Sequence, residues 1–263
     1  METPAQLTFN RLFLIVLLFF ISSSPLFVTA QDDSSQAVPK VLLIPYSPMM
    51  HLSDSDQDIS EGSQEEIGEM RQQLRKNLVA AINKQFAEVV DVKMPQRNFV
   101  GNTDDDFQTI YHALYYEQDS TFPSKFPKLY GRKDTTLYIS KTAKKPVEET
   151  VFINSGLRDK LLLHDLADKY GANYFIFLNE IDIKTHFDDC INLALKIYSR
   201  DLKVHYSIYD VSGKLVYGDV AVVHFPSNSN NVAEISQKTF PSIASQILRS
   251  FTQATTKSEL VKK

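Results

Sequence analysis

Cysteine, tryptophan and glycine are scarce in this 263-residue chain, which contains one cysteine, no tryptophan and eight glycines. The single thiol, Cys190, excludes an intramolecular disulfide and a thiolate metal cluster. No glycine-rich phosphate loop, dinucleotide fingerprint or Gly-X-Ser-X-Gly elbow is present. The sequence therefore lacks the common motifs of nucleotide-binding proteins and serine hydrolases.

The sequence is also poor in basic clusters. Its formal net charge is −4, from 28 lysines and arginines against 32 acidic residues. The pairs Lys144-Lys145 and Lys262-Lys263 are too short to form a basic patch. Because nucleic acid binding rewards a dense basic surface, this composition indicates a protein with no nucleic acid partner.

The first thirty residues carry one long apolar run. Ten consecutive hydrophobic residues, 12–21, follow Arg11, and Val28 and Ala30 have the small-residue spacing that a signal peptidase recognises. The pattern predicts a signal peptide, residues 1–30, cleaved after Ala30, and export to the periplasm or the exterior. A retained anchor is the alternative, but a spanning helix needs about 20 apolar residues, and 22–25 interrupt the run. We expect no transmembrane span in the mature chain.

The first half of the mature chain predicts strands and helices in alternation. Residues 31–37 are polar and predict a flexible N-terminus, and a short apolar run within 38–46 predicts a buried strand. An acidic loop is expected over 51–62, after which Ser63 and Glu66 form a capping box that opens a helix to Phe86. A strand at 89–92 and a helix at 104–117 complete this half.

The second half has clearer periodicity after a stretch without any. Residues 118–150 are interpreted as an insertion, with short strands expected at 135–140 and 149–153. A helix at 157–170 ends at Gly171, a residue suited to a left-handed cap. The remaining predicted elements are strands at 172–183, 202–208 and 214–225, a turn at 210–213 and a helix at 232–251, whereas 191–198 fits either a strand or a helix.

This order of elements predicts an α/β (α+β) fold, a single sandwich in which helices pack on a mixed sheet. One domain spans 38–252, with the insertion at about 118–150, and residues 253–263 form a polar C-terminal tail. A chain of this size buries enough apolar surface to fold without disulfides.

Three segments resemble the α/β fold shared by the TolB N-terminal domain, the LpoB-type synthase activators and the CsgG curli secretion proteins. Residues 40–46 are similar to their opening strand, 166–174 to their helix leading into a Gly-Ala-polar-Tyr strand start, and 209–217 to their Asp-X-X-Gly hairpin. The chain is also similar to exported proteins of Bacteroidetes-type bacteria. The resemblance implies binding of envelope proteins rather than catalysis, although the lipid-anchoring cysteine of the LpoB and CsgG types is absent.

An acidic segment resembles a calcium loop that precedes a helix. Its oxygen ligands would be Asp54, Asp56 and Asp58, with Glu65 at the twelfth position. The position that needs a glycine is Ile59, a residue that resists positive φ. Glu65 is equally explained as a first-turn acid that the helix dipole favours. A calcium site and a solvated acidic loop both remain open, and the sequence requires no cofactor.

Two smaller groups contain residue types suited to chemistry. His164 and Asp168 are four residues apart on a predicted helix, a spacing that suits either chelation or an ordinary surface pair. Cys190 has the residue types of a thiol nucleophile site close by, although members of a triad usually converge from distant segments. These neighbours are His186, Asp188 and Asp189.

Aromatic residues recur over 111–130, a stretch that continues into the predicted insertion. Tyrosine combines apolar area with a hydrogen-bonding tip, which suits recognition, but the same residues could instead cover the core. The candidate partner-binding residues are Tyr111, Tyr115, Tyr116, Phe122, Phe126 and Tyr130.

Taken together, these features favour a non-catalytic exported cell-envelope protein that binds a protein partner or a cell-wall component, in an assembly or accessory role. The alternative is an exported hydrolase that depends on a divalent cation held by the acidic loop 54–65.

Overall fold

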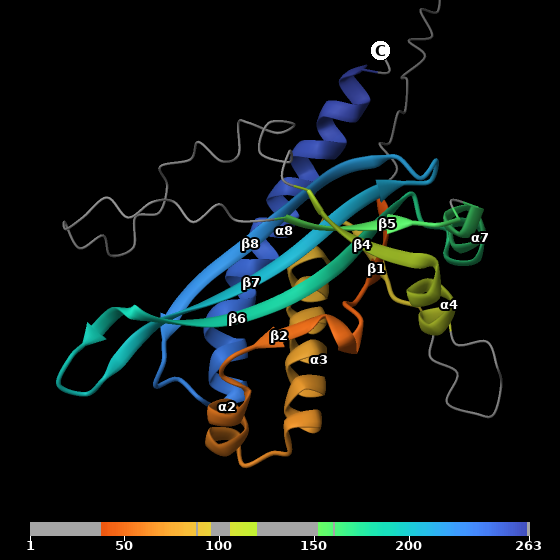
Figure 1. Ribbon diagram of the computed structural model, residues 1–263. Helices are drawn as coiled ribbons and strands as arrows, with labels where there is room; N and C mark the ends of the chain where they lie inside the picture. Colours follow the sequence, from red (N-terminus) through yellow and green to blue (C-terminus); the bar gives the residue numbers. More distant parts are fainter. Residues whose placement is uncertain (1–37, 88, 96–105, 120–151, 160, 262–263) are drawn as a thin grey trace, which may run out of the picture. The chain divides into compact units, whose positions relative to one another are not determined.

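The computed structural model describes residues 38–87, 89–95, 106–119, 152–159 and 161–261 (Figure 1). The predicted signal peptide, residues 31–37 and most of the predicted insertion lie outside these ranges. The described residues form a mixed sheet of six strands with helices packed on it, which confirms the predicted α/β class.

The sheet has the strand order β3-β1-β6-β7-β8, and β2 pairs with a later part of β6. β1 lies parallel to β3 and β6, whereas β7 is antiparallel to both of its neighbours, β6 and β8. β2 follows β1 along the same side of β6, because Ile44 pairs with Phe177 and His51 pairs with Ile181. The strands are β1 (Lys40–Ile44), β2 (His51–Ser53), β3 (Asp91–Lys93), β6 (Tyr174–Asn192), β7 (Ile197–Asp210) and β8 (Leu215–Pro226).

Helices α2 (Asp56–Ser63), α3 (Ile67–Phe86) and α8 (Val232–Val261) pack on one face of this sheet. Alternate residues of each strand point to that face, as the period of two in a strand requires. On β7 these residues are all buried, and they share one apolar core with α3 and α8: Leu202, Val204, Tyr206 and Ile208.

The other face is covered near the start of β6 by α4 (Asp106–Ala113), α7 (Leu161–Tyr170) and a two-stranded sheet of β4 (Leu114–Asp119) and β5 (Phe152–Leu157). A second apolar cluster fills the space between these layers. Its buried members include Leu42, Ile44, Phe175, Phe177, Leu163 and Leu166. Gly171 ends α7 with a φ of +64°, which confirms the predicted left-handed cap.

The segment expected to be an acidic loop is a strand and a helix. Residues 51–53 form β2, and 56–63 form α2, which buries Ile59 in the core. The predicted capping box is also wrong, because Ser63 is the last residue of α2 and α3 begins after Glu66 without a side-chain cap. Ser63 Oγ instead accepts a 2.9 Å hydrogen bond from the amide of Val232, at the start of α8. Local sequence did not reveal this role, since Ser63 and Val232 meet only in the folded chain.

Three predicted boundaries also change. The helix expected at 104–117 ends at Ala113, and the residues after it form β4. The helix expected from Leu157 begins at Leu161, which is 68% exposed. The strand expected at 149–153 lies at 152–157 as β5, and the one expected at 135–140 falls outside the described residues.

The helix expected at 232–251 is longer than predicted, because α8 continues through most of the polar tail to Val261. Phe251 packs against Phe86 and Tyr174, with ring centroids 5.8 and 5.5 Å apart, which anchors this part of the helix to the core. The hydroxyl of Thr255 donates to the carbonyl of Phe251, so the threonines satisfy their own hydroxyls within the helix. In the parts of the chain described, no helix is both long enough and apolar enough to cross a membrane.

Candidate functional site

The carboxylates predicted to hold calcium face different partners. Asp54 accepts hydrogen bonds from the amide of Thr185 on β6, at 2.9 Å and 3.1 Å, and from the hydroxyl of Ser55 at 2.6 Å. Asp58, in the first turn of α2, lies 3.3 Å from Nη2 of Arg200. Glu65 uses its backbone, which exchanges hydrogen bonds with Ser60.

Arg200 explains why two of these carboxylates lie where they do. Its side chain is 1% exposed and donates to Thr185 and to Asn230. Burial lowers the pKa of Arg200, and the carboxylates of Asp58 and Asp54 oppose that shift. The two acids therefore offset the positive charge of a buried arginine.

Asp56 belongs to a separate network at the end of β1. Its Oδ1 accepts from Nε2 of His51 at 3.0 Å, and its Oδ2 accepts from Nε of Arg71 at 2.6 Å. Burial alone would raise the pKa of Asp56, but hydrogen bonds from His51 and Arg71 hold it below its usual range. Across the described residues, no three acidic, histidine or cysteine side chains are grouped so as to hold a metal ion.

The predicted aromatic surface is divided by the structure. Tyr111 and Tyr116 are partly buried and pack against the second apolar cluster. Burial raises the pKa of Tyr116 to about 12. Tyr115 is 40% exposed, and its ring lies over Gly156 of β5, where a Cβ would be only 2.1 Å from the ring. The other three residues, Phe122, Phe126 and Tyr130, lie outside the described ranges.

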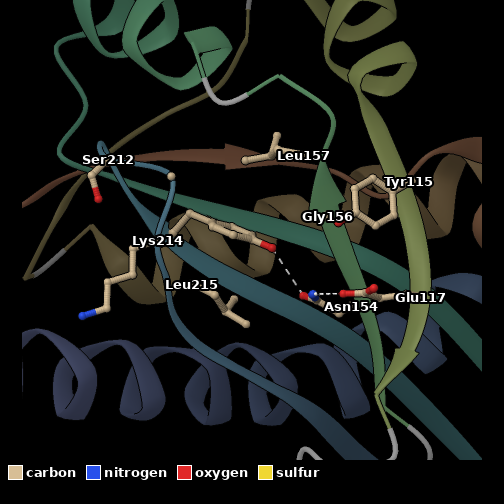
Figure 2. Close-up of a pocket in the computed structure, with 10 residues that line it drawn as sticks. Tyr115, Glu117, Asn154, Gly156, Leu157, Ser212, Lys214 and Leu215 are labelled. Atoms are coloured by element: carbon tan, nitrogen blue, oxygen red, sulfur yellow. Dashed lines mark hydrogen bonds between the residues drawn. The ribbon is translucent and has the colours of Figure 1, made fainter.

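A hollow of about 560 Å³ lies between the β4–β5 ribbon and the turn that joins β7 to β8 (Figure 2). Tyr115 and Glu117 line it on one side, and Ser212 and Lys214 line it on the other. Asn154 already donates to Glu117 at 3.1 Å and accepts from Ser207 at 2.7 Å. The hollow is thus a depression of the surface lined largely by polar groups that already bond to one another.

A buried polar layer lies beneath the β4–β5 ribbon. Burial, with the nearby carboxylate of Asp182, raises the pKa of Glu180 to about 7. Burial, with the nearby Lys203, lowers the pKa of His205 to about 4. His205 Nδ1 accepts from the amide of Ile153 at 3.0 Å, so the imidazole holds β5 on the sheet. This polar layer connects the two-stranded sheet of β4 and β5 to the six-stranded sheet.

The most distinctive exposed feature is the hairpin formed by the end of β6 and the start of β7. These strands pair as far as Asn192 and Ile197, whereas β8 pairs with β7 only from Ser199 onward. The last part of the hairpin therefore extends past the neighbouring strands, as Figure 1 shows. The segment 191–198, for which the sequence allowed either a strand or a helix, therefore forms the end of a hairpin.

The tip of this hairpin, residues 187–196, is exposed throughout and carries four large apolar side chains. A large exposed apolar surface on a folded protein commonly marks an interaction site. The exposed fractions are 71% for Phe187, 59% for Ile191, 83% for Leu193 and 69% for Leu195. The tip also carries two exposed acids, Asp188 and Asp189, and one exposed base, Lys196.

The base of the hairpin is held firmly. The amide of Tyr198 donates to the hydroxyl of Ser227 at 2.9 Å, and the amide of Ser227 donates to the carbonyl of Tyr198 at 2.9 Å. The ring of Phe187 meets that of Tyr198 edge to face at 5.3 Å. The tip therefore projects from a hairpin whose base is held by hydrogen bonds and ring packing.

In the part of the chain that the structure describes, neither of the smaller predicted groups gains the partners expected of it. Cys190 is exposed, and its thiol lies 3.5 Å from the carbonyl of Ile197. His186 instead directs Nε2 towards Asp201, at 2.9 Å. His164 and Asp168 are both exposed on α7, and the described residues bring no third ligand to them.

The signal for the tip in the sequence is a set of large apolar residues at alternate positions. Ile191, Leu193 and Leu195 alternate with small or polar residues, as in a half-buried strand. The sequence does not show that the strand ends beyond the sheet, where none of the described residues covers these side chains.

The class that these observations define is an α/β protein with an exposed apolar hairpin. No known family model matches the chain, and no curated protein matches it.

Proposed function

We propose that this chain is a non-catalytic, exported cell-envelope protein that binds a protein partner through the tip of the β6–β7 hairpin. The exposure of Phe187, Ile191, Leu193 and Leu195 on one projecting element carries the proposal. Binding would remove these side chains from water, at about 25 cal/mol for each Å² of apolar surface.

The charges beside the tip favour a protein groove over a lipid surface. Asp188 and Asp189 are exposed next to Phe187 and outnumber Lys196. Anionic membranes attract basic segments and repel acidic ones. An apolar groove with basic side chains at its rim complements this tip in both shape and charge.

Export and the envelope role rest on the first thirty residues and on the resemblance to TolB N-terminal, LpoB-type and CsgG-type domains. N-terminal sequencing of the exported protein is expected to give Gln31 as the first residue. An exported chain that retains Met1 would contradict cleavage after Ala30.

Because Cys190 is the only cysteine and lies in the tip, it allows a direct test of binding. The mature protein would be labelled there with a benzophenone maleimide and irradiated in an envelope extract of the source cells. We expect a discrete protein adduct that disappears in the Leu193→Ser/Leu195→Ser variant. Leu161→Ser is the matched control, because Leu161 is equally exposed at 68% but lies on α7.

Replacing both acids of the tip with lysine tests the expected basic rim and should weaken the adduct. An adduct that is equally strong in the Leu193→Ser/Leu195→Ser variant would refute the proposal. So would co-sedimentation of the unlabelled protein with phosphatidylglycerol vesicles that depends on the same two leucines.

A further inference from the structure

The carboxyl end of β1 lies where the sheet changes its direction of winding. β1 has β3 as its parallel neighbour on one side and β6 on the other. Helix α3, which precedes β3, covers one face of the sheet, and α7, which precedes β6, covers the other. In open α/β sheets, ligands bind beyond the carboxyl ends of the strands at such a switch point.

Polar side chains from separate elements meet at this point. Tyr46 follows β1, His51 begins β2, Arg75 comes from α3 and Tyr111 from α4. The rings of Tyr46 and His51 are 6.3 Å apart, and Cζ of Arg75 lies 5.9 Å from the ring centres of both tyrosines. Tyr111 donates to the carbonyl of Pro45 and accepts from Nη2 of Arg75 at 2.5 Å.

The cluster holds one positive charge in excess. Among the residues described, Arg71 and Arg75 each contribute a guanidinium, and Asp56 contributes the one carboxylate. Asp56 is engaged by Arg71 and His51. No carboxylate pairs with Arg75 among the residues described, and this side chain is half-buried.

Three buried polar atoms of the cluster have no hydrogen-bond partner within the described residues: Tyr46 Oη, Arg75 Nε and His51 Nδ1. Tyr46 is 1% exposed, and so is the side chain of His51. The first two atoms are donors. We assign His51 the tautomer with its proton on Nε2, facing the Asp56 carboxylate, and in this tautomer Nδ1 is an acceptor. A ligand that satisfies all three atoms must therefore both accept and donate.

We propose that this cluster is a binding site for inorganic phosphate. Its oxygens accept from Tyr46 and Arg75, its negative charge offsets the excess positive charge, and its P–OH donates to Nδ1 of His51. Sulfate has no such donor at neutral pH. A phosphomonoester loses its last proton near pH 6, whereas inorganic hydrogen phosphate keeps one. Arg75, stacked over two tyrosine rings, is the side chain that would have to move for the anion to enter.

The test uses the mature chain at pH 7.5 and constant ionic strength. Titration with sodium phosphate is expected to raise the melting temperature in a saturable way, by ligand linkage. Sodium sulfate and glycerol phosphate should bind at least several-fold more weakly. Arg75→Gln should weaken phosphate binding at least tenfold. Tyr46→Phe, which removes a single hydroxyl, should weaken it several-fold.

Arg158→Gln is the matched control, because this arginine is exposed and donates to the backbone carbonyl of His112. It should bind phosphate like the wild type. If Arg75→Gln does not fold, Tyr46→Phe decides the question alone. The proposal is refuted if phosphate gives no saturable shift, if sulfate binds as tightly as phosphate, or if Tyr46→Phe binds phosphate like the wild type. None of these outcomes depends on the hairpin partner.

Discussion

His224 on β8 donates from Nδ1 to the carboxylate of Asp201, directly across the sheet on β7, over 2.5 Å. The second carboxylate oxygen lies 2.9 Å from Nε2 of His186, at the base of the projecting hairpin. Asp201 therefore links β6, β7 and β8 where the hairpin leaves the sheet. The hydrogen bond from His224 holds Asp201 ionised, since it lowers a pKa that burial alone would raise.

This pair predicts a specific pH dependence. The hydrogen bond with Asp201 raises the pKa of His224 above its usual 6.5. The stabilisation is therefore fully present below pH 6.5 and is lost as the pH rises through the folded-state pKa. His224→Asn should lower the melting temperature at pH 5.5 and match the wild type at pH 9. Thermal melts from pH 5 to 9 test this, with His164→Asn on α7 as control. An offset that stays constant with pH would contradict the prediction.

Glu180 and His205 are expected to act in opposite directions. The raised pKa of Glu180, about 7, means that its contribution to stability is lost as the pH rises from 4.5 to 7. The lowered pKa of His205, about 4, means that its contribution is lost as the pH falls from 6.5 to 4. Relative to wild type, Glu180→Gln should gain stability with rising pH, by up to about 3 kcal/mol. His205→Gln should gain stability with falling pH.

Urea unfolding of both variants at half-unit steps between pH 4.5 and 7.5 measures these differences. The result that would count against the buried layer is a free-energy difference from wild type that does not change with pH in either variant.

Two helical glycines should respond oppositely to alanine. At Gly62 in α2, a Cβ would lie 2.4 Å from the backbone oxygen of Asn230, so the packing of α2 against the start of α8 must shift. Gly62→Ala should cost about 1–3 kcal/mol. At Gly68 in α3 no heavy atom lies within 4 Å of the added Cβ, and Gly68→Ala should stabilise by about 0.5–1 kcal/mol. Urea unfolding measures the change in the free energy of unfolding for each variant. A change of the same sign in both variants would contradict this packing.

The second apolar cluster should be essential for stability. Leu166 is 4% exposed within it, so Leu166→Ala should cost about 2–5 kcal/mol. Leu161, on the same helix, is 68% exposed, and Leu161→Ala should change stability by less than about 0.5 kcal/mol. Chemical denaturation of the pair measures the contrast, and a cost below about 1 kcal/mol for Leu166→Ala would mean that α7 is not packed as described.

Much of the core could be read from the sequence, because burial follows the period of each element. The apolar run of residues 41–44 predicted a strand buried on both faces, and all four side chains are buried. The alternation from Leu202 to Ile208 predicted a strand with one apolar face, which α3 and α8 cover. The glycine at position 171 predicted a left-handed backbone conformation there, since few other residues adopt it.

The candidate sites could not be read in the same way. The acidic segment matched the spacing of a calcium loop, but Asp54 and Asp58 face a buried arginine that comes from β7. Nothing near these acids in the sequence indicates that Arg200, more than 140 residues later, would be buried beside them.

The sequence alone determined most of the long strands and helices and which of their faces are apolar, because these depend on residues two to four positions apart. The tertiary structure alone decided which polar groups meet and which apolar groups stay uncovered. Tyr46, His51 and Arg75 come together because β1 and β2 follow one another along β6 and α3 packs on the same sheet. Leu193 and Leu195 remain exposed because β6 and β7 continue beyond β8. Both results depend on how distant elements pack and where they end, which no local pattern of residues specifies.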